Sequence, residues 1–154
     1  MPQHIPLLTL TVRDYDQAIA FYVGILGFAL LEDTDLGNGK RWVRVAPTGA
    51  DAAGGGARVP GAGISGGAAI LLARAVTPEQ LATVGNQTGG RVFLFLHTDD
   101  FDRDYRAYVS RGVRFVREPV EQLYGTVAVF ADVYGNLWDL IGPKPSEPSG
   151  ARCR

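Results

Sequence analysis

Two segments of the chain repeat one pattern, and this internal repeat strongly restricts the possible fold. The segments cover residues 7–28 and 93–113. In each, a stretch rich in β-branched or aromatic residues leads to an aspartate, Asp14 or Asp100, and then to a helical stretch that ends near a glycine. Aspartate suits a helix N-cap because its carboxylate accepts hydrogen bonds from the free amides of the first turn. The repeat therefore predicts a strand and a capped helix, twice.

Both helical stretches carry apolar side chains at spacings that place them on one face, as in a helix packed on a core. These side chains are Ile19, Tyr22, Ile25 and Leu26 in the first stretch, and Phe101, Tyr105, Tyr108 and Val109 in the second. Three candidate strands follow each helix, at residues 28–31, 41–45 and 68–73 and at residues 114–117, 126–130 and 137–141. Each half of the chain therefore has the order βαβββ.

Short turns between the later strands, such as Tyr134-Gly135-Asn136, favour antiparallel neighbours. We therefore predict an α+β fold in which two βαβββ modules, at about residues 5–73 and 91–142, form a curled, mostly antiparallel sheet around a cup with the helices outside. The length of 154 residues suits one domain, at residues 1–142. The tail at 143–154 is expected to be disordered, and the Gly- and Ala-rich segment at 47–68 is either a surface insertion or a lid over a pocket.

Charge and hydropathy exclude several classes of partner. A formal net charge of −1 gives no long-range attraction for nucleic acid or an anionic membrane surface. No apolar run approaches the about 20 residues of a membrane span, and the first ten residues lack signal-peptide features, so we expect a cytoplasmic protein. The single cysteine, Cys153, has no partner in the chain for a disulfide or a thiolate metal cluster.

Two stretches carry a family resemblance. Residues 12–22 with Leu26-Gly27-Phe28, and later the run from Asp132 through Gly135-Asn136 to Ile141, resemble the vicinal oxygen chelate superfamily over about residues 5–142. That superfamily includes glyoxalase I, extradiol dioxygenases, fosfomycin-resistance transferases and bleomycin-resistance binding proteins. One fold hosts several activities there, so the activity has to be argued from the site.

The resemblance also implies where a metal would bind. Superfamily enzymes usually hold a divalent ion with His or Glu side chains from the first and fourth strands of each module. The matching positions here are Leu7, Leu71, Phe93 and Asp139, of which only Asp139 carries a donor atom. One carboxylate leaves a divalent ion almost wholly hydrated. We therefore expect no bound metal and no cofactor.

Strand alternation predicts which side chains line the cup, because residues two apart share a face. They are Leu7, Thr9 and Thr11, then Phe93, Phe95 and His97, then Leu137, Asp139 and Ile141. Trp42 and Arg44 share a face too, and alternation leaves two alternatives open for them. Either they point into the cup and hold a planar or anionic ligand, or Val43 and Val45 face the core and the pair covers the outside.

Four residues, His97, Asp139, Tyr124 and Trp138, need an interpretation of their own. His97 and Asp139 could act together as general base and acid, or His97 could be a hydrogen-bonded structural histidine. Arg44 or a ligand cation could satisfy the Asp139 carboxylate. Tyr124 either contacts a ligand at the rim or packs beside a turn. Trp138 alternates with Asp139 and is assigned to the core.

Two functions follow from these residues. The first is a metal-independent protein, similar to bleomycin-resistance members, that binds and sequesters a small aromatic or cationic compound through an apolar, aromatic cup. The second is a glyoxalase-like lyase or dioxygenase-type enzyme that works without a metal or with a weakly bound one. The open edges of a curled sheet favour a homodimer.

Overall fold

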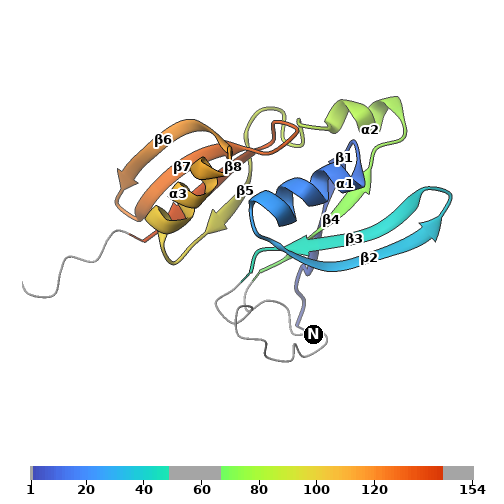
Figure 1. Ribbon diagram of the computed structural model, residues 1–154, viewed down its shortest axis with the longest axis horizontal. Coiled ribbons are helices and arrows are strands. Elements are labelled where there is room, and N and C mark those ends of the chain that lie inside the picture. Colours follow the sequence, from blue (N-terminus) through green and yellow to red (C-terminus); the bar gives the residue numbers. More distant parts are fainter. Residues whose placement is uncertain (1, 49–66, 144–154) are drawn as a thin grey trace, which may run out of the picture. The chain divides into compact units, whose positions relative to one another are not determined.

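The computed structural model describes residues 2–48 and 67–143, which form two compact units within residues 1–87 (module one) and 88–154 (module two) (Figure 1). Most of the glycine-rich segment predicted as a lid or insertion lies outside the described residues, as does nearly all of the tail predicted to be disordered. Each module is described by itself.

Module one is a four-stranded mixed sheet with the strand order β1-β4-β3-β2. Its first and last strands, β1 and β4, are parallel, and the other two pairings are antiparallel. A helix connects β1 to β2, and a short second helix follows β4. The elements are β1 (Leu7–Val12), α1 (Tyr15–Ile19), η1 (Ala20–Ile25), β2 (Ala29–Gly37), β3 (Lys40–Ala46), β4 (Ala69–Arg74) and α2 (Pro78–Thr83).

Module two has the same topology, with the strand order β5-β8-β7-β6 and a parallel pairing of β5 with β8. Its elements are β5 (Val92–His97), α3 (Phe101–Ser110), β6 (Arg114–Gln122), β7 (Gly125–Ala131) and β8 (Leu137–Gly142). The predicted α+β class and the two βαβββ modules are confirmed. Two of the three pairings in each sheet are antiparallel, as the short turns indicated.

Both aspartates of the repeat cap their helices. Asp14 Oδ1 accepts a hydrogen bond from the Gln17 amide at 2.8 Å, and Asp100 Oδ1 accepts one from the Arg103 amide at 3.1 Å. The first helix departs from α geometry after Ile19: η1 is a π-helix, and the Leu26 amide bonds the Phe21 carbonyl five residues back at 2.9 Å. The predicted N-termini of both helices are therefore confirmed, whereas the sequence analysis did not predict the π-helical turn.

Three local predictions differ from the structure. β2 and β6 continue to residues 37 and 122, well past the predicted 31 and 117, because largely exposed residues keep pairing with β3 and β7 without an apolar alternation to reveal them. Helix α2 was missed, although Thr77 and Gln80 form a capping box, which is readable in sequence. Val109 was assigned to the core stripe of α3 but is 49% exposed, because it lies at the margin of that stripe near the end of the helix.

Module two is built around stacked aromatic rings on the helix side of its sheet. The Phe130 ring lies 6.0 Å from that of Trp138, nearly parallel to it, and 5.7 Å from that of Tyr108 on α3. Trp138 is 2% exposed, which confirms its assignment to the core. In module one, Val43 and Val45 are fully buried and fill the corresponding space. One face of each sheet is thus packed against the core. The side chains that alternate with the packed ones therefore lie on the opposite face of the sheet.

The caps give a direct stability prediction. Replacing Asp14 or Asp100 with alanine leaves the first-turn amide without its side-chain acceptor and is expected to lower the free energy of unfolding by about 1 kcal/mol in each case. The asparagine variants keep an acceptor and serve as controls with nearly unchanged stability. Urea unfolding followed by circular dichroism measures both effects. Equal losses in the alanine and asparagine variants would show that charge, not capping, matters.

Candidate functional site

The candidate site is formed by the sheet face opposite the packed one in each module, here called the open face. In β8 the alternation is clear: Trp138 and Leu140 are buried, whereas Asp139 and Ile141 are half-buried. Because Trp138 stacks on Phe130, which contacts Tyr108 of α3, the intervening Asp139 lies on the open face. The same reasoning places its sheet neighbours.

Asp139 lies in a row of four residues that crosses the open face of module two. Its register partners are Phe95 on β5 and Val129 on β7, and Val129 in turn pairs with Arg117 on β6. Phe95 is 61% exposed, whereas Val129 is buried. The row therefore presents an accessible aromatic ring beside a half-buried carboxylate, with a guanidinium at the far end.

Burial raises the pKa of Asp139, and the charge of Arg117 opposes this increase in part. Within the part of the chain that the structure describes, no hydrogen bond or ion pair reaches this carboxylate. A desolvated carboxylate without a close partner is costly, so a bound cation or hydrogen-bond donor would stabilise it. Arg44, which the sequence analysis named as one possible partner, forms an ion pair within module one.

The ion-pair partner of Arg44 is Glu32 on the neighbouring strand of module one. Arg44 Nε lies 3.2 Å from Glu32 Oε1, and both side chains are partly exposed. Since Val43 and Val45 fill the packed side, Arg44 and Trp42 lie on the open face, where Arg44 pairs in register with Leu71. The valines therefore face the core, and Trp42 and Arg44 share the face of Leu71.

Phe93 departs from simple alternation. A bulge between Val92 and Leu94 gives β5 one residue more than β8 at this point, so the alternation on either side of it is shifted. The Phe93 ring lies edge-on to that of Trp138, with centroids 6.1 Å apart, and so contacts the packed interior. The expectation that Phe93 shares a face with Phe95 thus differs from its position. No periodicity in the sequence reveals such a bulge.

His97 and Tyr124 are both exposed and lie away from the central row. His97 ends β5 opposite Ile141, on the same face as Asp139, but no hydrogen bond joins the two side chains. Tyr124 is in the turn between β6 and β7 and is 69% exposed. The structure therefore brings Phe95, His97 and Asp139 to one face without an acid–base pair.

A polar cluster that sequence reasoning missed lies at the end of β1. The Gln87 amide Nε2 donates to Thr11 Oγ1 at 3.0 Å and to the Thr83 carbonyl at 2.7 Å, and Thr83 Oγ1 donates to Thr11 Oγ1 at 2.9 Å. These bonds tie α2 and the residues after it to β1. Thr11 was predicted in the cup, but Gln87 carries no sequence signal because its partner is 76 residues away.

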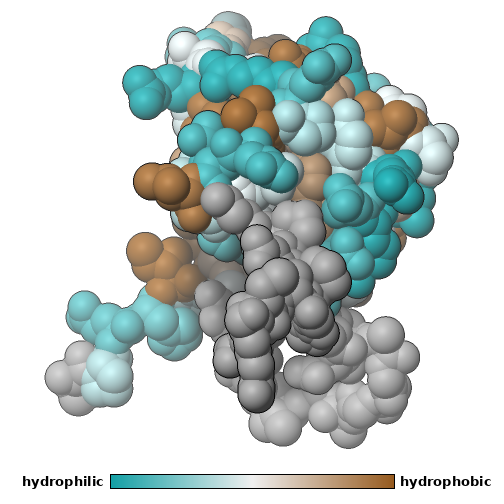
Figure 2. Space-filling model, turned by 90° about the vertical axis from the view of Figure 1, so that its left-hand side faces the viewer, coloured by the Kyte–Doolittle hydropathy of each residue, from teal (hydrophilic) through white to brown (hydrophobic). Residues whose placement is uncertain are grey.

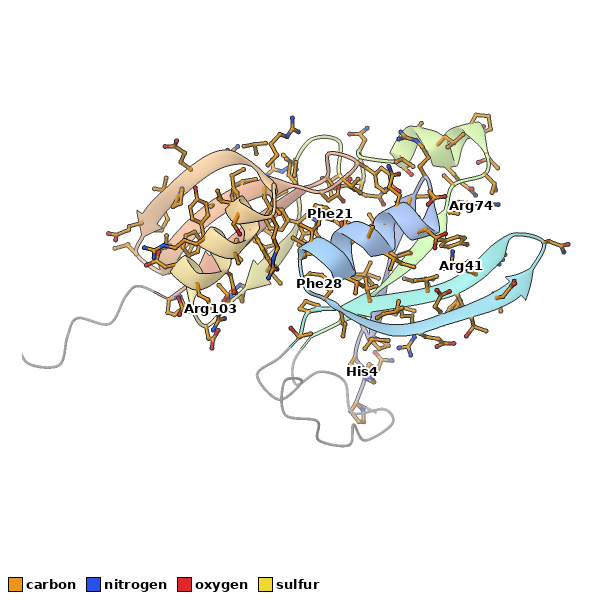
Figure 3. The ribbon with its side chains drawn as sticks, in the orientation of Figure 1. His4, Phe21, Phe28, Arg41, Arg74 and Arg103 are labelled. Carbon is orange, nitrogen blue, oxygen red and sulfur yellow. The ribbon has the colours of Figure 1, made fainter. Side chains whose placement is uncertain are left out.

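Two arginines labelled in Figure 3, Arg41 and Arg103, each form a cluster with aspartates. Arg41 pairs with Asp16 and Asp33 and lies over the ring of Tyr15. Arg103 pairs with Asp99 and Asp104 at the start of α3. Each arginine already has two carboxylate partners, so neither cluster is a candidate ligand site. Exposed apolar residues are scattered among hydrophilic ones on the side shown in Figure 2.

The donor set does not fit a metal. Three of the four positions that the family resemblance assigns to ligands, Leu7, Leu71 and Phe93, carry no donor atom. Across residues 2–48 and 67–143, no group of three or more His, Cys, Asp or Glu side chains is placed to hold an ion. The chemistry available on the open faces is therefore apolar contact, ring stacking and charge pairing.

None of the helices within residues 2–48 and 67–143 is long and apolar enough to span a membrane.

Comparison with known proteins identifies the family of this chain. Residues 4–140 match the Glyoxalase/Bleomycin resistance protein/Dioxygenase superfamily. An uncharacterized protein of Shewanella frigidimarina (strain NCIMB 400) is 52% identical over 149 residues, which are 96% of this chain and 99% of that protein. The name of that protein gives no activity, so this similarity does not indicate a function.

Two solved structures are similar along most of their length. UcmS2 is 28% identical with a TM-score of 0.70 and covers 92% of this chain and 98% of its own. TnmS3, described as an antibiotic binding protein from Streptomyces sp. CB03234, is 31% identical with a TM-score of 0.66 and covers 93% of this chain and 98% of its own. The fold is therefore shared with a protein that is described as antibiotic binding.

The raised pKa of Asp139 predicts how stability depends on pH. The folded chain holds this proton more tightly than the unfolded chain, whose carboxyl pKa is about 3.9, so the free energy of unfolding falls as pH rises from that value through the folded pKa. Asp139→Asn cannot ionise and should remove this decrease, making the variant more stable than the wild type at pH 7.

Chemical unfolding between pH 4 and pH 7 measures this effect. Asp102→Asn, on the exposed side of α3, makes the same chemical change away from the open face and should keep the decrease in stability that we assign to Asp139. A lower stability of Asp139→Asn at pH 7 would contradict the prediction and would mean that the carboxylate has a stabilising partner.

Proposed function

Because the chain belongs to the Glyoxalase/Bleomycin resistance protein/Dioxygenase superfamily, we propose that it binds a small aromatic compound without a metal and thereby sequesters it. Each module offers its own open face for binding, and Phe95 is the central contact on that of module two. Trp42 and Arg44 provide an aromatic plate and a polar group in module one. Tyr124 is proposed as a contact at the rim of module two.

One observation carries this proposal: three of the four positions that the resemblance assigns to metal ligands are apolar, whereas the open face of module two keeps the exposed ring of Phe95. Apolar and aromatic area with a few oriented polar groups is the composition of sites for organic ligands. The likeness to TnmS3, whose description names antibiotic binding, supports the same class of ligand. The metal-dependent activities of the superfamily are not supported by this donor set.

The alternative of an acid–base enzyme receives less support. It requires His97 and Asp139 to exchange a proton with a substrate held between them, with a third group to orient the ring. His97 is exposed at the end of a strand, and no bond connects it to Asp139. We therefore place both residues on a binding surface.

Two further proposals concern the state of the protein. A homodimer is proposed because β1 and β5, at the edges of their sheets, each pair on one side only among the described strands. Size-exclusion chromatography with light scattering distinguishes it from a monomer. A cytoplasmic location remains a proposal from the sequence.

Metal content tests the first half of the proposed function. Protein purified without chelator or affinity-tag metal is expected to contain far less than one equivalent of Ni, Zn, Mn or Fe by elemental analysis, because three of four ligand positions lack donors. Titration with each ion should leave the melting temperature unchanged. Near-stoichiometric binding would refute the proposal and bring glyoxalase- or dioxygenase-type chemistry back.

Ligand binding tests the second half. The neutral planar probe acridone is expected to bind the wild type, measured by the change in its own fluorescence, and Phe95→Ala should weaken binding about tenfold because a stacking surface is lost. Val109→Ala, on the exposed side of α3, removes a comparably accessible apolar side chain and should have no effect. Equal affinities for the wild type and Phe95→Ala would remove Phe95 from the site.

A further inference from the structure

We propose that Phe95 and Asp139 together form a site for a protonated amine carried by the aromatic ligand. This inference rests on the proposed function and adds the chemistry of the ligand to it. The two residues are register partners on the parallel strands β5 and β8, and both lie on the open face of module two. The pair lies within one module and therefore forms a site by itself.

The spacing of the pair suits a single ammonium group. Neighbouring strands lie about 4.8 Å apart, so one cation can contact the edge of the carboxylate and the face of the ring at the same time. The ring attracts a cation through its negative face, and this attraction strengthens when the cation is partly desolvated. The 61% exposure of Phe95 leaves that ring accessible.

The charge of the site also favours a cation. Asp139 is half-buried and has no hydrogen-bond or ion-pair partner among the described residues, so an ammonium would replace the water that the carboxylate has lost. Arg117 lies two strands away in the same row, beyond the buried Val129, and only partly offsets the negative charge. His97, the other ionisable side chain of this face on β5, is exposed at the strand end.

Three probes with the same tricyclic frame test the inference. 9-Aminoacridine is cationic at neutral pH, acridone is neutral and acridine-9-carboxylate is anionic. We expect the wild type to bind 9-aminoacridine about tenfold more tightly than acridone and to bind the carboxylate more weakly than either. Fluorescence titration at pH 7 and low salt measures all three dissociation constants.

Variants separate the carboxylate from the general charge of the protein. Asp139→Asn should abolish the preference for 9-aminoacridine over acridone, since it removes the charge and nearly keeps the shape of the side chain. Asp102→Asn makes the same change on the exposed side of α3 and should keep the preference. Arg117→Gln should increase the preference, because the opposing charge is removed. Circular dichroism and thermal unfolding establish that each variant is folded.

The failures are distinguishable. Binding of acridone with no preference for 9-aminoacridine, or with a preference for the carboxylate, overturns the amine site and leaves the proposed function intact. A cation preference that survives in Asp139→Asn also overturns it, because the charge that selects the amine must then lie elsewhere. If none of the three probes binds, the proposed function and the amine site fail together.

Discussion

The parallel pairing of the first and last strands is the contact on which each module depends. It brings β5 beside β8, and so sets Phe95 against Asp139, although 44 residues separate them in the chain. The capped helix between β5 and β6 covers one side of this pairing, where Trp138 and Phe130 form the core. Because that side is filled by rings, the alternate residues of β8 are left on the open face.

The two modules use this plan with different chemistry. On the open face of module one, Arg44 and Glu32 neutralise each other on neighbouring strands. On the open face of module two, the register partners of Asp139 on both neighbouring strands are apolar. The basic residue of the same row, Arg117, lies two strands away. Among the described residues, the open face of module one thus carries an ion pair, and that of module two carries a carboxylate without an ion-pair partner. Because of this difference, we place the proposed amine site in module two.

The proposed function rests on the side chains at the positions that the family resemblance assigns to metal ligands. Leu7, Leu71 and Phe93 carry no donor atom for a divalent ion, and Leu71 shares the open face of module one with Arg44. Binding energy on such a surface comes from burial and stacking, with charge providing selection.

The sequence by itself determined the repeat, the two aspartate caps, the βαβββ order and the burial of Trp138, because these follow from local hydrogen bonding and from alternation within one element. It also marked Asp139 as the remaining donor. Only the tertiary structure decided the orientation of Phe93, the Arg44–Glu32 pair and the tie from Gln87 to Thr11. These depend on a bulge, on strand register and on contacts between distant residues, which leave no periodic pattern in the chain.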